Sequence, residues 1–126
     1  MDRVPRISDA EWEVMHVVWS RHPVVAQDVV DDLSPRRGWS MRTVKSLLSR
    51  LVKKGVLGFD VDGKRYLYRP LLSREECTDA ESRSFVDRVF VGDASPLVAH
   101  FLKKGRFTEE EIEELRRILD SREQNP

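Results

Sequence analysis

Cysteine is almost absent from this chain. Its single cysteine, Cys77, rules out an intramolecular disulfide and fits a reducing compartment. No apolar run approaches the ~20 residues that a membrane-spanning helix needs. The N-terminus also lacks the apolar segment of a secretory signal. These absences predict a cytoplasmic protein with no stable membrane association.

The spacings that hold metals, phosphates or nucleophiles are missing as well. The sequence has no CxxC, no HExxH and no glycine-rich phosphate loop. One cysteine and scattered histidines do not make a structural zinc site. Cys77 follows a predicted helix start, where the helix dipole lowers a thiol pKa, but the sequence pairs it with no base. We therefore expect a protein that is not an enzyme, with no catalytic residue, metal or cofactor; a hydrolase using Cys77 is the weakest alternative.

An excess of one charge is also absent, because 22 Lys and Arg balance 22 Asp and Glu. The charges are unevenly distributed, however. Residues 1–70 carry 13 basic and 9 acidic side chains, whereas residues 71–126 carry 9 and 13. Within residues 36–69 the count is 10 basic against 2 acidic. A local basic footprint of this kind suits a polyanionic partner despite the neutral total.

One stretch inside that footprint, from Ser40 to Gly55, has the pattern of an amphipathic helix. Its apolar residues recur at helical spacing, Ser40 is a plausible N-cap, and Gly55 suits a left-handed C-terminal position. The polar face contains cations and hydroxyls but no acid, which suits phosphates and base edges. We interpret it as a DNA recognition helix; the alternative is a solvated face that happens to be basic. The apolar residues are Val44, Leu47, Leu48, Leu51 and Val52.

The flanking segments complete a winged helix-turn-helix pattern. Ser8 and Glu11 form a predicted capping box for a first helix, and a second helix is expected over about 25–33, followed by a turn at 34–38 and a short strand at Trp39. After Gly55, two β-rich segments flank Asp62-Gly63, which predicts a hairpin with a basic tip. In this layout the third helix enters the major groove and the wing reaches neighbouring backbone. The predicted DNA-binding residues are Ser40, Arg42, Thr43, Lys45, Ser46, Arg50, Lys53, Lys64 and Arg65.

Residues 71–126 predict three further amphipathic helices. Capping boxes at Ser73 and Thr108 start two of them, and Ser95-Pro96 is expected to start the helix between. Three short helices bury too little surface alone. We expect a second copy to cover them, with packing onto residues 1–70 in a monomer as the alternative. The predicted dimerisation residues are Phe85, Val89, Phe90, Leu97, Val98, Phe101, Leu102 and Leu115.

The fold class that follows is mainly α with a small β-hairpin. Residues 1–70 are predicted to form a winged helix-turn-helix DNA-binding domain and residues 71–126 a helical dimerisation domain. Two functional classes remain open besides the hydrolase. The leading hypothesis is a dimeric transcriptional repressor, and its alternative is a protein-interaction module whose basic helix binds an acidic protein.

Several blocks of the sequence resemble the BlaI/MecI family of penicillinase and methicillin-resistance repressors. The blocks are residues 7–15, 39–55 and 68–77, and the likeness continues through Ser84-Phe85 and residues 111–115. The resemblance implies a bacterial homodimeric repressor that binds inverted-repeat operators with TACA/TGTA-type half-sites. It places base contacts on Arg42, Thr43 and Ser46. It also implies relief of repression by cleavage in the dimerisation domain, through a sensor-linked protease that responds to β-lactams.

Two positions depart from known branches of that family. Staphylococcal members are cut at an Asn-Phe bond, and the matching bond here is His100-Phe101, the candidate cleavage site. The copper-responsive branch carries a C-terminal cluster of cysteines, whereas this chain has none there. The resemblance therefore favours regulation of β-lactam-resistance or related genes over copper sensing, and leaves the inducer unnamed.

Overall fold

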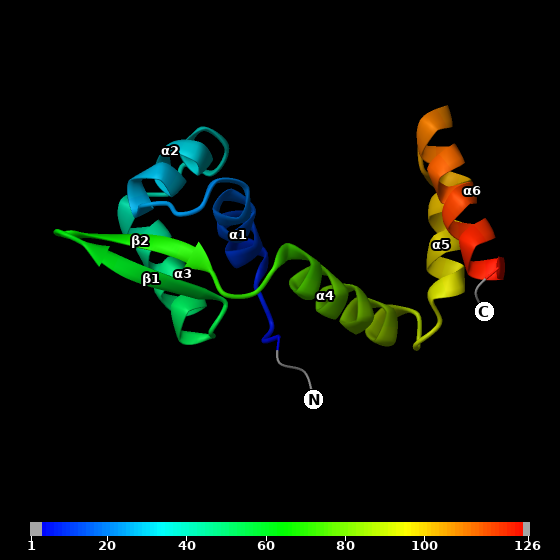
Figure 1. Cartoon of the computed structure of the whole chain (residues 1–126), viewed down its shortest axis with the longest axis horizontal. Helices are drawn as coiled ribbons and strands as arrows, with labels where there is room; N and C mark the ends of the chain where they lie inside the picture. Colours follow the sequence, from blue (N-terminus) through cyan, green and yellow to red (C-terminus); the bar gives the residue numbers. More distant parts are fainter. Residues whose placement is uncertain (1–3, 125–126) are drawn as a thin grey trace. The chain divides into compact units, whose positions relative to one another are not determined.

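A computed structural model describes residues 4–124. The chain divides into two compact units, residues 1–82 and residues 83–126. Six helices and one hairpin follow one another along the described residues (Figure 1). The elements are α1 (Asp9–Arg21), α2 (Ala26–Arg37), α3 (Met41–Lys53), β1 (Leu57–Asp62), β2 (Arg65–Pro70), α4 (Arg74–Val89), α5 (Ala94–Lys104) and α6 (Glu109–Gln124).

Helices α1, α2 and α3 pack around the core of the first unit. The predicted capping box starts α1: Glu11 N–H donates to Ser8 Oγ over 3.2 Å, and Ser8 N–H donates to Glu11 Oε1 over 2.8 Å. The apolar stripe of α3 faces inward, and its outer face is polar, so burial orients the helix. The largest fully buried side chains of this core include Met15, Leu33, Leu48, Leu51 and Leu57.

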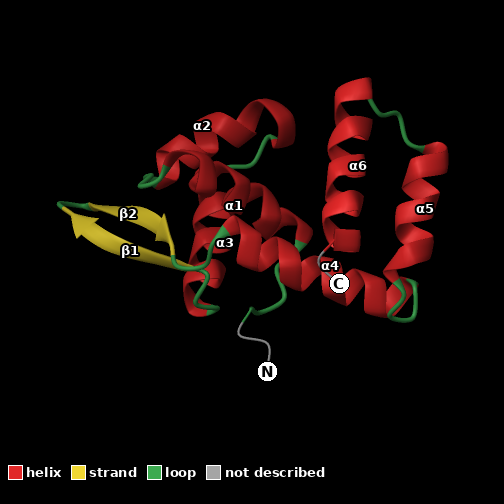
Figure 2. Cartoon of the chain, turned by 45° about the vertical axis from the view of Figure 1, so that its right-hand side comes forward, coloured by secondary structure: helices red, strands yellow, loops and turns green. Residues whose placement is uncertain are grey.

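The predicted hairpin is confirmed. Strands β1 and β2 pair antiparallel from Leu57 opposite Pro70 to Asp62 opposite Arg65. Gly63 has a φ of 65° at the turn, a conformation that glycine adopts without steric cost. At the base, Tyr68 and Val24 exchange two backbone hydrogen bonds of 2.7 and 3.0 Å. Those bonds join the hairpin to the segment before α2, so the hairpin is attached to the helical core (Figure 2).

Helix α4 begins in the first unit and ends in the second. Its predicted capping box is present, with Glu76 N–H donating to Ser73 Oγ over 3.0 Å. The helix ends at Val89 because Val91 and Gly92 both adopt left-handed backbone conformations. In the second unit, α5 and α6 run in opposite directions (Figure 2). The capping box at Thr108 and Glu111 is also present at the start of α6.

Three details of the sequence-based expectation were wrong. Residues 34–37 continue α2 instead of forming a turn, because the φ that proline imposes is helical and Gly38 N–H closes the last turn on Ser34 O at 2.8 Å. Trp39 is not in a strand. Helix α5 starts at Ala94 and not after Ser95, because Asp93 Oδ1 accepts from Ser95 N–H and acts as the N-cap.

Within residues 4–124, no helix is long and apolar enough to cross a bilayer.

Candidate nucleic-acid interface

The polar residues of α3 form one continuous exposed face. Successive residues of an α-helix are about 100° apart, so the exposed positions fall on one side and the buried stripe on the other. Ser40 accepts a 3.2 Å hydrogen bond from Thr43 N–H, which fixes the start of the helix beside that face. Nine residues were predicted to contact DNA, and all nine are exposed: Ser40, Arg42, Thr43, Lys45, Ser46, Arg50 and Lys53 on or before α3, and Lys64 and Arg65 at the hairpin tip.

Ion pairs divide the basic residues of the footprint into two groups. Arg36 and Arg37 both pair with Glu13 on α1. Arg65 pairs with Asp62 and Arg69 with Asp60, each over 3.3 Å. Lys54 pairs with Glu11. Within residues 4–124, the other five have no acidic partner: Arg42, Lys45, Arg50, Lys53 and Lys64.

This division concentrates the unpaired positive charge. Four of the five unpaired cations lie on the outer face of α3, and Lys64 lies in the turn of the hairpin. Cations already paired with carboxylates gain less from a phosphate, because the existing pair must first be broken or shared. The surface available to a polyanion is therefore the outer face of α3 together with the hairpin tip. It includes only the unpaired half of the basic residues in the segment 36–69.

A partly buried ion pair anchors the C-terminal end of α3. Glu11 is 1% exposed, and Lys54 Nζ lies 2.6 Å from its Oε1 and 2.8 Å from the carbonyl oxygen of Arg6. Burial raises the pKa of the Glu11 carboxyl, but hydrogen bonds from Lys54 and Ser8 and the charge of Lys54 outweigh it and hold that pKa below its ordinary value. The pair ties α1 to the residue that follows α3, and so helps to fix the direction of α3.

The two faces of the hairpin differ in chemistry. One face carries the Asp60–Arg69 and Asp62–Arg65 ion pairs. The other carries aromatic rings: Phe59 and Tyr66 stack with centroids 4.3 Å apart, and the ring of Tyr68 lies 6.0 Å from that of Phe59. Burial, together with the neighbouring Tyr66, raises the pKa of the Tyr68 phenol, so that phenol stays neutral at ordinary pH.

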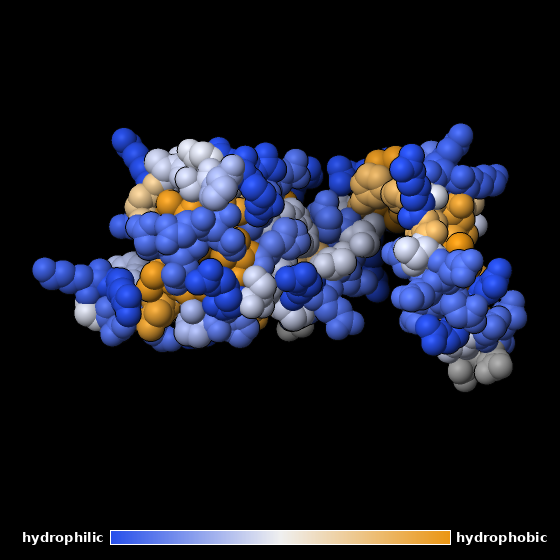
Figure 3. Space-filling model, turned by 90° about the horizontal axis from the view of Figure 1, so that it is seen from above, coloured by the Kyte–Doolittle hydropathy of each residue, from blue (hydrophilic) through white to orange (hydrophobic). Residues whose placement is uncertain are grey.

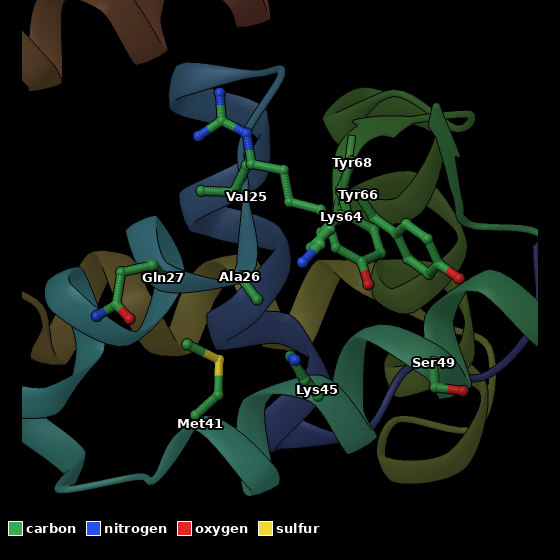
Figure 4. Close-up of a pocket in the computed structure, with 10 residues that line it drawn as sticks. Val25, Ala26, Gln27, Met41, Lys45, Ser49, Lys64, Tyr66 and Tyr68 are labelled. Atoms are coloured by element: carbon green, nitrogen blue, oxygen red, sulfur yellow. The ribbon is translucent and has the colours of Figure 1, made fainter. Parts of the chain in front are cut away.

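A groove lies between α3 and the hairpin. It has a volume of about 600 Å³, and Lys45 and Ser49 of α3 and Lys64 and Tyr66 of the hairpin line it (Figure 4). Neither Ser49 nor Tyr66 was among the predicted DNA-binding residues, although Ser49 belongs to the polar face of the predicted recognition helix. The helical period does place Ser49 on the outer face, and strand alternation places Tyr66 on the face opposite the ion pairs, so both signals were present in the sequence.

Cys77 has no feature of a nucleophile. Its side chain is buried, at 1% exposure, and burial together with the nearby Glu76 raises the pKa of its thiol. The dipole of α4 was expected to lower that pKa; this expectation was wrong, because burial and the charge of Glu76 raise it. The hydrolase hypothesis therefore loses the residue on which it rested.

The second unit lacks a core of its own within one chain. No described side chain from Arg83 to Glu123 is buried, although α4, α5 and α6 each carry large apolar residues. Of the predicted dimerisation residues, Phe90, Leu97 and Leu115 are partly buried, and Phe85, Val89, Val98, Phe101 and Leu102 are exposed. Apolar side chains are visible on the surface of these helices in Figure 3. Ile112, Ile118 and Leu119 of α6, which were not among the predicted dimerisation residues, are exposed as well.

Comparison with known proteins identifies close relatives. The family model described as penicillinase repressor matches residues 7–121. The penicillinase repressor of Bacillus licheniformis is 36% identical over 120 residues, which cover 95% of this chain and 94% of that protein. The methicillin resistance regulatory protein MecI of Staphylococcus aureus strain N315 is 34% identical over 116 residues, covering 92% of this chain and 94% of that protein.

Two solved structures resemble part of this chain in both fold and sequence. One is the DNA-binding domain of the repressor BlaI in solution, with a TM-score of 0.54. The other is the monomeric form of Bacillus licheniformis BlaI in complex with the blaP half-operator, with a TM-score of 0.52. Each is 37% identical in sequence, and each match covers 60% of this chain and 93% of the chain in the solved structure.

Proposed function

Since the chain belongs to the penicillinase repressor family, we propose that it is a transcriptional repressor that binds duplex DNA through α3 and the hairpin. The observation that carries this proposal is the concentration of unpaired cations on the outer face of α3 and at the hairpin tip. A relative of the same fold is described in complex with a half-operator. The genes that this chain regulates are proposed to serve β-lactam resistance or a related response, because the relatives are named for penicillinase and methicillin resistance.

Base reading is assigned to the first two turns of α3. Arg42, Thr43 and Ser46 are exposed there. Arginine can donate two hydrogen bonds to the major-groove edge of guanine, and hydroxyls can donate to or accept from several bases. Lys45, Arg50, Lys53 and Lys64 are assigned to phosphates, which fix the register on the duplex but read no sequence.

The proposed active species is a homodimer on an inverted-repeat operator. The exposed apolar side chains of α4, α5 and α6 need a cover that the described residues of one chain do not supply. A second copy provides an identical apolar surface, and two-fold symmetry matches a two-fold repeat in the DNA. Joining two DNA-binding units makes the second contact intramolecular, which raises affinity by ~10²–10⁴-fold.

Loss of this dimer is the proposed route to derepression. The His100-Phe101 bond, the candidate cleavage site, lies inside α5 and beside exposed Val98 and Leu102. A sensor-linked protease would have to unwind α5 before it could cut this bond, because a helical segment does not fit an extended-substrate cleft. Cutting there would remove α6 and part of α5 from the apolar surface.

Titration of a labelled duplex at several salt concentrations tests the proposal. A DNA-binding protein loses affinity steeply with salt, because bound cations release condensed counterions from the duplex. An inverted-repeat duplex with TACA/TGTA half-sites should bind more tightly than a scrambled duplex of the same composition. Failure to bind either duplex at low salt would refute the repressor and favour the competing function, a module in which α3 docks an acidic protein.

A further inference from the structure

The groove between α3 and the hairpin has the chemistry of a polyanion site. Its walls come from α3, from the hairpin and from the first turn of α2, and the ten residues that line it include no acid. Lys45 projects from one wall and Lys64 from the other, with Tyr66 beside Lys64 (Figure 4). Neither lysine has an acidic partner within residues 4–124. The groove is therefore open, cationic on both sides and partly aromatic.

If the chain binds duplex DNA as proposed above, the geometry of the duplex indicates which part of the DNA would occupy the groove. A helix in the major groove and a hairpin that reaches past the groove edge lie on opposite sides of one sugar–phosphate strand. That strand must then pass between α3 and the hairpin. The described residues leave a groove of about 600 Å³ at this place.

Tyr66 is unusual among the residues that line the groove. Its side chain is 47% exposed, yet its ring is held by stacking on Phe59 at an interplanar angle of 20°. The ring of Tyr68 lies edge-on at 6.2 Å and supports it from the core side. A wing that used charge alone would have no need for an exposed aromatic pair. A rigid ring with a hydroxyl group loses little conformational entropy when it binds.

We propose that this groove binds one sugar–phosphate strand of the operator and that Tyr66 is a backbone contact within it. The Tyr66 ring packs against a deoxyribose, and its hydroxyl donates a hydrogen bond to a phosphate oxygen between Lys45 and Lys64. Tyrosine hydroxyls are among the ordinary donors to DNA phosphates. Because this contact adds no cation, it should raise affinity for every sequence without releasing a counterion.

The test compares Tyr66→Phe and Tyr66→Ala with the unchanged full-length protein. Affinities for the inverted-repeat and scrambled duplexes are measured over a salt series. Tyr66→Phe keeps the stack on Phe59 and loses the hydroxyl, so affinity for both duplexes should fall by about 3- to 10-fold, the effect of one hydrogen bond. The slope of log affinity against log salt should stay unchanged. Tyr66→Ala should lose more, because it also removes the ring.

Two controls separate this contact from other effects. Val61→Ala changes an exposed apolar residue on the same face, directly opposite Tyr66 and outside the groove lining, and should bind as the unchanged protein does. Lys64→Ala should reduce the salt slope by about one, as the loss of a charged phosphate contact requires. If both Tyr66 variants bind both duplexes with unchanged affinity, the Tyr66 contact is refuted while the repressor function stands. Absence of salt-dependent duplex binding by the unchanged protein would refute the function itself.

Discussion

Lys54 Nζ lies 2.6 Å from Glu11 Oε1, whereas the adjacent Lys53 has no acidic partner within residues 4–124. Two neighbouring lysines thus have different surroundings. Lys54 is directed inward, where its ammonium neutralises a buried carboxylate. Lys53 is on the outer face of α3 and available to a phosphate. The sequence alone assigned Lys53 to DNA and left Lys54 unassigned, and the ion pair supplies a physical reason for that difference.

Alanine at each of these lysines should separate stability from DNA binding. Lys54→Ala leaves the Glu11 carboxylate buried and uncompensated, so the free energy of unfolding of the first unit should fall by about 2 kcal/mol. The salt slope of DNA binding should not change. Lys53→Ala should leave stability nearly unchanged and reduce the salt slope by about one. Denaturant unfolding and duplex titration measure both quantities, and a lowered slope for Lys54→Ala would show that Lys54 contacts phosphate instead.

Acid should weaken the same anchor. The folded pKa of Glu11 lies below its ordinary value of 4.5, so its stabilising contribution is fully present above that pH and is lost as pH falls through the folded pKa. Glu11→Gln should be less stable than the unchanged protein at neutral pH, and the difference should shrink as the pH drops below 4.5. Thermal unfolding of both proteins over a pH series measures this. A stability difference that is constant with pH would contradict an ionised, ion-paired Glu11.

The two cations at the hairpin tip, Lys64 and Arg65, should contribute unequally to DNA binding. Arg65 already pairs with Asp62 over 3.3 Å, whereas Lys64 has no acidic partner in the described residues. Replacing both with alanine should reduce the salt slope by ~1–2 units, and Lys64→Ala should account for most of it. Asp62→Asn should strengthen binding to all sequences, because it frees Arg65. An unchanged slope in the double variant would mean that the hairpin stays off the DNA.

Phe101→Asp should disrupt the dimer and leave the first unit folded. Phe101 is 54% exposed in α5, so a single chain tolerates the change, but a dimer would have to bury an unpaired carboxylate at a cost of several kcal/mol, on the order of 3–5. Sedimentation should show a monomer or a weak dimer, and operator binding should weaken in parallel.

Lys103→Asp is the matched control for that variant. It introduces the same side chain on the same helix, at an exposed position away from the apolar stripe of α5. This variant should sediment and bind as the unchanged protein does. A tight dimer of Phe101→Asp would show that α5 is not part of the dimer surface. A monomer with full operator affinity would show that operator binding does not depend on the dimer.

Local chemistry explains which parts of the fold could be predicted. Capping boxes at Ser8, Ser73 and Thr108 and the turn at Gly63 each involve residues a few positions apart, so the sequence carries all the necessary information. The end of α2 was mispredicted because Pro35 is often a breaker. Here its helical φ is acceptable, and Glu13 on α1 pairs with Arg36 and Arg37 in the last turn. That partner is distant in sequence, and tertiary contacts override local propensity.

The candidate DNA-binding site also has some features that the sequence predicts and others that it does not. The helical period was enough to place Arg42, Lys45 and Arg50 on an exposed face. It could not show which cations are paired, because Glu11 and Lys54 are 43 residues apart in the chain. The groove was missed for a related reason: it forms only where the hairpin lies beside α3, and the approach of two elements that are distant in sequence is not visible in a one-dimensional pattern.

The exposed face of α3 is proposed to read base sequence in duplex DNA, and Arg42 is the residue at which this base reading can be tested most sharply. Affinities of the unchanged protein and Arg42→Ala are determined for the inverted-repeat duplex and for a scrambled duplex at the same salt concentration. Arg42→Ala should lose ~1–3 kcal/mol of binding to the inverted repeat and far less to the scrambled duplex, because a base contact exists only on the correct sequence. Equal losses on both duplexes would make Arg42 a phosphate contact and contradict the assignment of α3 as the recognition helix.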